Sequence, residues 1–254
     1  MNNVEAFFEL HKGPELLLIG NVWDAASAQL FERAGYKALA TSSAALAETL
    51  GYEDGEHLPF ELLLQTIQRI LNRVSVPLSV DMERGYSSSI QGIIENVARL
   101  YDLGVVGMNI EDSVRDGGRS LQPMEDFSRM LDELSNHLAR TNRKFFINAR
   151  TDAFLTGHSS PLPETIKRAH AYENAGANGL FVPFAAEPED IKAIVQSTSL
   201  PVHLLYYQKL PTYKELLQLG VRRVSQGTAL YRSMMAGLEK HIRAIQEQQA
   251  FVNI

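Results

Sequence analysis

Two acidic residues separated by a single position mark the stretch Val80-Asp-Met-Glu-Arg-Gly-Tyr86 as a candidate for chemistry. A run of strand-forming residues, 77–80, leads into it, and residues two apart on a strand point to the same side. We therefore expect Asp81 and Glu83 to face one point at the end of a strand. Two like charges repel there unless a proton or cation lies between them, and carboxylate oxygens suit a hard divalent ion, most simply Mg2+. The alternative interpretation is a polar turn that caps a helix.

Other polar residues follow further predicted strands. Ser42 and Ser43 come after the second strand, Glu111 after the fourth and Arg150 after the fifth, while Asp54 lies in the loop after the second. Several acidic strand ends around one opening are costly to pack together without a cation. The set therefore favours a metal site.

Arg150 and the hydroxyl groups also have plainer interpretations. A guanidinium can hold a substrate carboxylate through two parallel hydrogen bonds, but Arg150 could instead form a structural ion pair with Glu111 or Asp152. The segment Ser42 to Ala44 stands where backbone N–H groups can bind an oxyanion, or where they form an ordinary turn. Trp23 follows the first strand at the same end, so it could line the pocket or pack in the scaffold.

Strand and helix patterns alternate along the whole chain, which implies parallel strand pairing. Eight such units in 254 residues predict a (β/α)8 TIM barrel that forms one domain over residues 1–254. An open doubly wound sheet is the alternative, but the chain lacks its Gly-x-Gly-x-x-Gly turn. The expected strands are 16–20, 37–41, 78–83, 105–110, 144–149, 179–182, 202–205 and 221–224. The expected helices are 25–34, 59–73, 90–103, 123–140, 188–196, 212–219 and 228–248.

Composition narrows the class of protein. The formal net charge is -6 and no Lys/Arg tract is present, which argues against a nucleic-acid partner or an anionic membrane surface. The absence of cysteine excludes disulfides, thiolate metal sites and a cysteine nucleophile. No apolar run approaches the roughly 20 residues that span a bilayer, and the N-terminus lacks the pattern of a signal peptide. We therefore expect a cytoplasmic protein.

With these residues in view, the sequence resembles the phosphoenolpyruvate mutase/isocitrate lyase superfamily from about residue 20 to about residue 230. The resemblance implies a (β/α)8 barrel that binds Mg2+, or alternatively Mn2+, in front of a small α-keto or α-hydroxy acid. It implies a reaction that makes or breaks a C–C or P–C bond through an enolate. The matching motifs are Thr41-Ser-Ser-Ala44, Gly51-Tyr-Glu-Asp-Gly55, Val80-Asp-Met-Glu-Arg-Gly-Tyr86, Asn109-Ile-Glu-Asp112 and Ile147-Asn-Ala-Arg-Thr-Asp152.

The resemblance also implies roles for single residues. Asp81 would be the direct metal ligand, and Asp54, Glu83 and Glu111 would hold the water molecules of the metal. The segment Ser42 to Ala44 would bind substrate oxygens, and Arg150 would stabilise the negative charge that develops in the reaction. The residues expected to take part directly in catalysis are Arg150, Glu111 and Ser42.

The loop 113–120 departs from this superfamily. The isocitrate and methylisocitrate lyases carry Lys-Lys/Arg-Cys-Gly-His there, with the cysteine as acid/base, and this chain has no cysteine. The phosphonopyruvate-handling members carry a lysine and an Asn-Ser pair, whereas here Arg119 precedes Ser120. We expect Arg119 and Ser120 to contribute to substrate binding. Because the loop contains Gly117-Gly118 and no large apolar anchor, we expect it to be open without ligand and to close over an anion as a lid.

The leading hypothesis is an Mg2+-dependent lyase that acts on a small α-keto or α-hydroxy acid, with cleavage, decarboxylation and hydrolysis all open. Phe184 and Tyr206-Tyr207 stand where the methylisocitrate branch carries polar residues, which favours a short acid over a tricarboxylate. The alternatives are a phosphonate P–C bond enzyme and a non-catalytic keto-acid-binding protein. The resemblance further implies a homo-oligomer, dimer or tetramer, with the C-terminal helix in subunit contacts.

Overall fold

Eight parallel strands close into a barrel in the order β1-β10-β9-β8-β7-β4-β3-β2 in the computed structural model, which describes residues 2–115, 117–249 and 251. The (β/α)8 barrel predicted from the sequence is confirmed, although the strand ends differ from the expected ranges by a few residues. The barrel strands are β1 (Leu17–Val22), β2 (Leu39–Thr41), β3 (Leu78–Asp81), β4 (Gly107–Glu111), β7 (Phe146–Arg150), β8 (Gly179–Val182), β9 (Val202–Leu205) and β10 (Arg223–Ser225).

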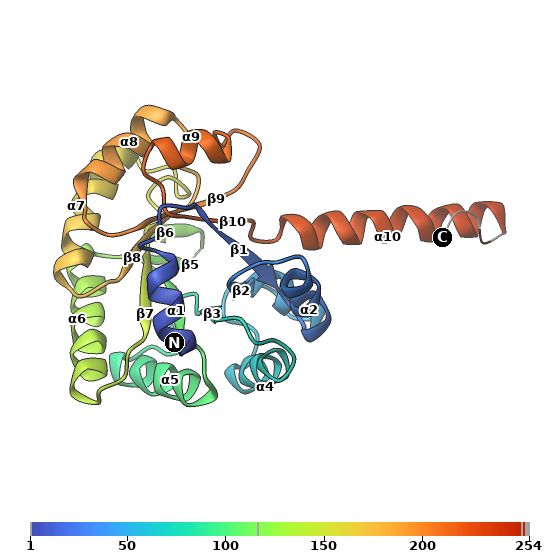
Figure 1. Ribbon diagram of the computed structural model, residues 1–254, viewed down its shortest axis with the longest axis horizontal. Helices are drawn as coiled ribbons and strands as arrows, with labels where there is room; N and C mark the ends of the chain where they lie inside the picture. The colour runs from blue at the N-terminus through green and yellow to red at the C-terminus, as the bar shows by residue number, and fades with distance from the viewer. Residues whose placement is uncertain (1, 116, 250, 252–254) are drawn as a thin grey trace.

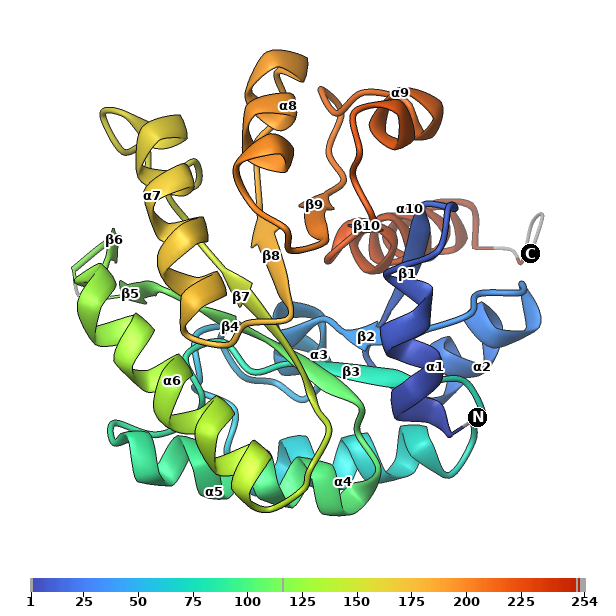
Figure 2. The same ribbon diagram turned by 60° about the vertical axis from the view of Figure 1, so that its left-hand side comes forward.

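Helices surround the barrel, as Figures 1 and 2 show. Asp24 caps the helix that follows β1 by accepting a hydrogen bond from Ser27 N, and Gly104 ends the one that follows β3 in a left-handed conformation. The helices are α1 (Asn3–Leu10), α2 (Ala25–Arg33), α3 (Ser43–Thr49), α4 (Phe60–Leu71), α5 (Ile90–Leu103), α6 (Met124–Arg140), α7 (Pro161–Asn174), α8 (Pro188–Ser197), α9 (Tyr213–Gln218) and α10 (Ala229–Gln248). The sequence analysis did not predict α1, α3 or α7.

Helix α1 packs against the N-terminal end of the barrel. Its buried Phe7 makes an edge contact with Phe146, the first residue of β7, at 5.3 Å between ring centroids. The same ring lies near the guanidinium of Arg223, the first residue of β10. This end of the barrel is therefore covered by apolar packing, and the site must lie at the opposite end, where parallel barrels place their chemistry.

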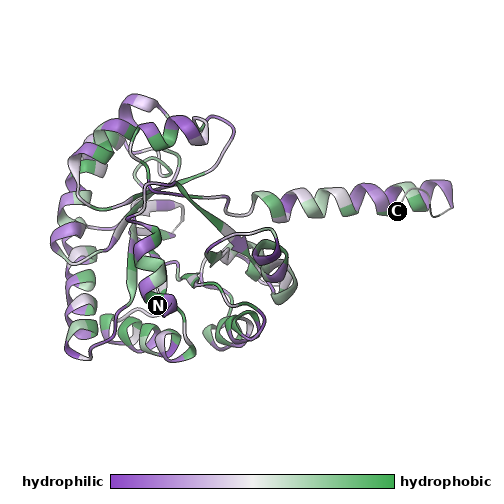
Figure 3. Cartoon of the chain, viewed as in Figure 1, coloured by the Kyte–Doolittle hydropathy of each residue, from purple (hydrophilic) through white to green (hydrophobic). Residues whose placement is uncertain are grey.

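Helix α10 projects away from the barrel (Figure 1). Near its start, buried Tyr231 makes an edge contact with Trp23. Beyond that point, apolar and polar residues mix along its exposed length (Figure 3). None of the described helices is long and apolar enough to cross a membrane.

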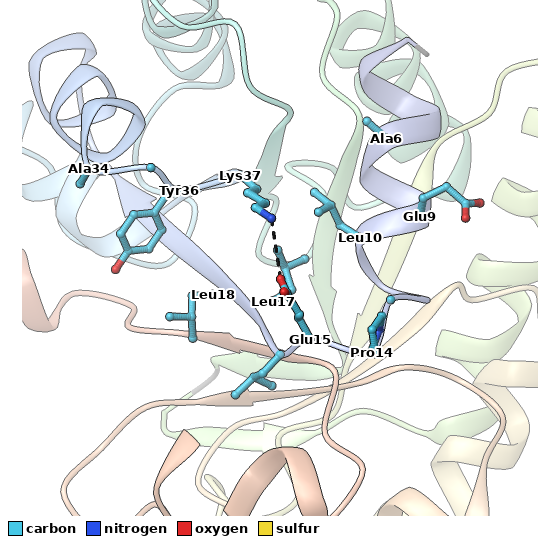
Figure 4. A pocket seen from close by; sticks show the side chains of 13 residues that line it. Ala6, Glu9, Leu10, Pro14, Glu15, Leu17, Leu18, Ala34, Tyr36 and Lys37 are labelled. Carbon is cyan, nitrogen blue, oxygen red and sulfur yellow. Dashed lines mark ion pairs between the residues drawn. The ribbon is translucent and has the colours of Figure 1, made fainter. Parts of the chain in front are cut away.

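A cavity of about 750 Å3 lies beside the outer face of β1, between α1 and the segment that follows α2 (Figure 4). Leu17 and Leu18 line it from the strand, and Tyr36 lines it from the segment after α2. An ion pair between Lys37 and Glu15 crosses it at 3.7 Å. This cavity is on the outside of the barrel, away from the strand ends that carry the predicted site.

Candidate active site

A second cavity, of about 730 Å3, lies at the C-terminal ends of the barrel strands. It gathers side chains from segments that are far apart in the sequence, including nine of the eleven residues predicted for the site. The predicted residues that line it are Ser42, Ser43, Ala44, Asp54, Asp81, Glu83, Glu111, Arg119 and Arg150.

Asp81 is the last residue of β3, and its carboxylate is held on one side only. Its Oδ2 atom accepts a hydrogen bond from Ser43 Oγ at 2.9 Å, and its backbone N–H donates to Thr41 Oγ1 at 2.9 Å. Its Oδ1 atom is buried and has no partner among the described residues. Burial raises the pKa of Asp81 above its ordinary value, while the charge of Arg150 opposes that shift. A buried carboxylate oxygen without a donor is an incomplete arrangement that a cation would complete.

Glu83 lines the cavity, but it does so from a turn after β3 and not from the strand itself. Strand β3 ends at Asp81, and Glu83 follows in a left-handed turn with φ of 47°. Its Oε1 atom accepts hydrogen bonds from Glu56 N at 3.0 Å and from the hydroxyl of Tyr86 at 3.3 Å. Burial, together with the charges of Asp54 and Asp81, raises the pKa of Glu83 to about 8. The side chain was expected to lie on the strand, and that part of the prediction is wrong.

Arg150, the last residue of β7, lies between two carboxylates. Asp152 accepts hydrogen bonds from its Nε at 2.6 Å and its Nη2 at 3.1 Å, and Glu111 Oε2 lies 2.9 Å from Nη1. Burial lowers the pKa of the guanidinium, but these carboxylates outweigh it and raise the pKa above its ordinary value. Burial also raises the pKa of Glu111, to about 7, against the opposing charge of Arg150. Arg150 therefore forms the structural ion pairs that the sequence left open and still lines the cavity.

A second buried network supports this group from behind, and the sequence analysis did not foresee it. Asp112 Oδ1 accepts a hydrogen bond from Asp152 N at 2.9 Å. Its Oδ2 atom accepts from Arg168 Nη1 at 2.9 Å and from Tyr172 Oη at 2.6 Å. Arg168 and Tyr172 come from α7, so this helix fixes the segment after β7.

The described residues of the loop 113–120 form a hairpin, and its opening and closing with ligand stays a prediction. Strands β5 (Ser113–Arg115) and β6 (Arg119–Leu121) pair as an antiparallel hairpin. Arg115 Nη2 lies 2.6 Å from Asp54 Oδ2, and Arg119 Nη1 lies 2.7 Å from Asp152 Oδ2. These ion pairs hold the hairpin over the cavity, because each arginine meets a carboxylate of the site.

Two predicted substrate-binding residues lie elsewhere. Trp23 is buried against Tyr231 and does not line the cavity, because its ring packs beneath α10. Ser120 lies on β6, on the outer side of the hairpin. It is therefore exposed and lines a different hollow. Neither Trp23 nor Ser120 is brought to the wall of this cavity, and their roles in substrate binding stay predictions.

The residues of the cavity fit a magnesium ion held mostly through water. Within residues 2–115, 117–249 and 251, no three His, Cys, Asp or Glu side chains form a ready-made metal cluster. Asp81 and Asp54 nevertheless each carry a buried Oδ1 atom without a partner in that part of the chain. Mg2+ commonly binds one or two carboxylates and keeps several of its waters. Asp81 could therefore bind the ion directly, with Asp54, Glu83 and Glu111 around its waters.

The remaining wall of the cavity combines apolar and neutral polar groups. Phe181, Phe184 and Leu205 line it near β8 and β9, and Tyr207 Oη donates to Phe184 O at 3.1 Å. Asn21 and Ser225 line it from β1 and β10. The sequence analysis missed Asn21 and Ser225, although both stand at or near the ends of predicted strands.

Comparison with known proteins places this geometry in context. The model of the family described as phosphoenolpyruvate phosphomutase matches residues 7–246. The 2-methylisocitrate lyase of Escherichia coli K12 is 32% identical over 198 residues, which are 76% of this chain and 66% of that enzyme. A crystal structure from Burkholderia cenocepacia J2315, provisionally named a phosphonomutase, is 34% identical with a TM-score of 0.90 and covers 95% of this chain and 99% of its own.

A more distant structure shares the fold. A phosphonopyruvate hydrolase in complex with oxalate and Mg2+ is 23% identical with a TM-score of 0.87, and covers 99% of this chain and 89% of its own.

Proposed function

The chain belongs to the phosphoenolpyruvate phosphomutase family, and from that premise we propose that it is an Mg2+-dependent lyase that cleaves or forms a C–C bond of a short α-keto or α-hydroxy acid. One observation carries the proposal. The buried Oδ1 atom of Asp81, which has no partner among the described residues, and the guanidinium of Arg150 line one cavity at the strand ends. A cation site beside a fixed guanidinium suits an acid whose carboxylate and neighbouring oxygen need positive charge on both sides.

The acidic residues would hold the metal. Asp81 would bind Mg2+ directly, and Asp54, Glu83 and Glu111 would accept hydrogen bonds from its waters. When bound, Mg2+ supplies a positive charge that withdraws electrons from the substrate's carbonyl oxygen. A protein of the same fold, phosphonopyruvate hydrolase, forms a complex with oxalate and Mg2+, which supports the choice of magnesium as the metal.

Arg150 would orient the substrate and meet its developing charge. Asp152 occupies the Nε–Nη2 edge of the guanidinium, so the Nη1 side faces Glu111 and the cavity. A guanidinium fixed on one edge needs little reorganisation as charge develops on a substrate oxygen. Ser42 and Ala44 line the same cavity and would contact the substrate oxygens.

The hairpin β5–β6 would limit access of water. Arg115 and Arg119 tie it to Asp54 and Asp152, so it covers the acidic side of the cavity. Excluding water strengthens the interactions of Arg150 with a bound acid and protects reactive species from stray protons.

Turnover of a panel of acids with Mg2+, followed by proton and phosphorus NMR, tests the proposal. The panel contains oxaloacetate, 2-methylisocitrate, shorter 2-hydroxy acids and phosphonopyruvate. We expect C–C cleavage of at least one carbon acid, abolished by EDTA. Cleavage of phosphonopyruvate alone would instead favour a P–C bond enzyme. Binding of oxalate with Mg2+ but no turnover would favour a non-catalytic binder.

A further inference from the structure

A chain of buried polar side chains lies beneath the cavity and begins at Arg223. This residue is fully buried, and its Nη2 atom lies 3.3 Å from a side-chain atom of Asn109. A guanidinium has only donors. The atom of Asn109 that faces Arg223 must therefore be the oxygen Oδ1, which settles the orientation of that amide.

Asn148 and His203 follow from this starting point. Asn148 lies 2.8 Å from the same Oδ1 atom, so its facing atom must be the amino nitrogen Nδ2. That nitrogen also lies 2.9 Å from His203 Nδ1. An amide nitrogen cannot accept a hydrogen bond, so His203 Nδ1 is the acceptor and the ring proton is on Nε2.

The charge state of His203 agrees with this tautomer. Burial, together with the charge of Arg223, holds the pKa of His203 well below its ordinary value, so the ring is neutral. Its Nε2 atom lies 2.8 Å from Ser225 Oγ. Nε2–H must donate to that oxygen, and the Ser225 hydroxyl must direct its own proton elsewhere.

Ser225 lines the cavity, and among the described residues its Oγ atom has no other hydrogen-bond partner. The hydroxyl proton can therefore serve a ligand. The network beneath it, starting at Arg223, makes the hydroxyl a donor towards the cavity and prevents His203 from acting as its base.

Asn21 offers a second hydrogen-bond donor to the cavity, and its orientation is fixed independently of the network that starts at Arg223. Its Oδ1 atom accepts hydrogen bonds from Gln226 N at 2.7 Å and Gly227 N at 2.8 Å. Backbone N–H groups can only donate, so the other branch of the amide is the amino group Nδ2. Asn21 lines the cavity, and this amino group donates to no residue in the described part of the chain.

The two donors lie on neighbouring strands, β1 and β10, which pair directly (Figure 2). In the closed strand order, β9 and β8 separate β10 from β7, and β2 and β3 separate β1 from β4. Glu111 and Arg150 end β4 and β7, so they lie across the barrel from Asn21 and Ser225. A ligand that contacts Arg150 on one side of the barrel and Asn21 with Ser225 on the other must carry oxygen atoms at both of its ends.

Resting on the function proposed above, we propose that Asn21 Nδ2 and the Ser225 hydroxyl bind the second carboxylate of a short α-keto dicarboxylic acid. Two donors from adjacent strands suit the two oxygens of one carboxylate. Arg232 lines the same cavity and forms no ion pair with any of the described residues, so a second negative charge has a cation nearby. The substrate class is therefore a dicarboxylate rather than a monocarboxylic acid.

A binding comparison tests this assignment with two probes in the presence of Mg2+. Oxalate serves as the reference because its two carboxylates are directly bonded and too short to span the barrel mouth, whereas 3,3-difluorooxaloacetate carries a distal carboxylate two carbons beyond its first. We expect Ser225→Ala to weaken difluorooxaloacetate by about ten- to hundred-fold, as for a lost hydrogen bond to a charged group, and to change oxalate less than twofold. Ser159→Ala, at an exposed serine outside the cavity, should change neither.

The outcomes separate this inference from the function on which it rests. Equal weakening of both probes, or no weakening of difluorooxaloacetate, would overturn the second-carboxylate site. If wild-type protein binds neither probe with Mg2+, the proposed function fails.

The donor direction has its own test, which needs no ligand. Long-range proton–nitrogen correlation on histidine-labelled protein at pH 7 should show the Nε2-protonated neutral tautomer for His203, assigned by its loss in His203→Gln. An Nδ1-protonated ring would overturn the inference even if the protein proves to be a lyase.

Discussion

Ser43 Oγ donates a hydrogen bond to Asp81 Oδ2 at 2.9 Å and so joins the segment after β2 to the end of β3. The bond fixes which carboxylate oxygen faces the protein and which stays free. Because Oδ1 is buried without a partner, the energetic cost of burying Asp81 is not repaid by the described residues. A residue kept at such a cost is a candidate for function rather than for stability.

The first prediction concerns Asp81. We expect Asp81→Ala to abolish the binding of Mg2+ with oxalate, because it removes the direct ligand. The variant should fold, since it removes a buried charge whose pKa is raised. Calorimetric titration measures the affinity, with Asp132→Ala on the exposed surface of α6 as the matched control. Unchanged affinity in Asp81→Ala would refute the metal assignment.

Arg150 is the subject of the second prediction. Arg150→Lys keeps the positive charge but loses the planar fork that meets Asp152 and Glu111. Turnover should fall on the order of 10²-fold, the loss typical of one transition-state donor, while the affinity for Mg2+ should change little. Steady-state kinetics measures the first effect and calorimetry the second. Arg129→Lys, on the exposed face of α6, is the control, and wild-type turnover in Arg150→Lys would leave Arg150 a purely structural role.

The sequence predicted the parts of the fold and site that depend on local pattern. The strand before Asp81 and the helix 90–103 ended by Gly104 could be read from short stretches, because a strand period and a helix stop leave local signals. Glu83 shows the limit. It has a left-handed conformation, and its carboxylate contacts Glu56 and Tyr86, and no alternation rule foresees such a turn.

The donors at β1 and β10 also could not have been predicted from the sequence, but the reason is different. Ser225 is oriented through His203, Asn148 and Asn109, whose side chains meet only once the barrel closes. A serine at the end of a predicted strand is by itself weak evidence. The direction of its proton is a property of the whole network, not of any segment.

The third prediction concerns the network behind the site. Arg168→Met leaves the buried carboxylate of Asp112 without its ion-pair partner. Removing one partner of a buried pair costs about 3–5 kcal/mol of the free energy of unfolding. Urea denaturation followed by circular dichroism measures it. The double variant Arg168→Met/Asp112→Asn should recover part of the loss, because no unpaired charge remains, and a loss no smaller than that of the single variant would contradict this explanation.

The fourth prediction is a loss of stability in mild acid. Burial, followed by the charge of Arg223, lowers the pKa of His11 from 6.5 to about 3. The unfolded chain therefore binds one more proton than the folded chain between these values, so stability is lost as the pH falls below about 6.5. For this residue alone the free energy of unfolding should fall by about 2 kcal/mol between pH 7 and pH 5.

Urea titrations of wild type and His11→Gln at both pH values measure this contribution. The variant should be less stable at pH 7, because it loses the stacking of His11 on Phe146, but it should depend less on pH. His170→Gln, at an exposed position of α7, is the control and should keep the wild-type pH dependence. An identical pH dependence in His11→Gln and wild type would show that His11 is not the titrating group.

The last prediction concerns the homo-oligomer and α10. In proteins, most helical stability comes from packing an apolar face of the helix against another element. Met234, Leu238 and Ile242 recur on α10 at intervals of four residues and are 47%, 50% and 56% exposed. We expect this face to pack against a second copy of the chain, so wild type should be a dimer or tetramer.

Light scattering after size-exclusion chromatography measures the mass. The variant Leu238→Glu/Ile242→Glu places two charges in the proposed contact and should shift the protein towards the monomer, because an unpaired charge is costly to bury between subunits. Lys240→Glu changes the charge of α10 at an exposed polar position and should leave the mass unchanged. A monomeric wild type, or a double variant that assembles like wild type, would mean that α10 does not form the subunit contact.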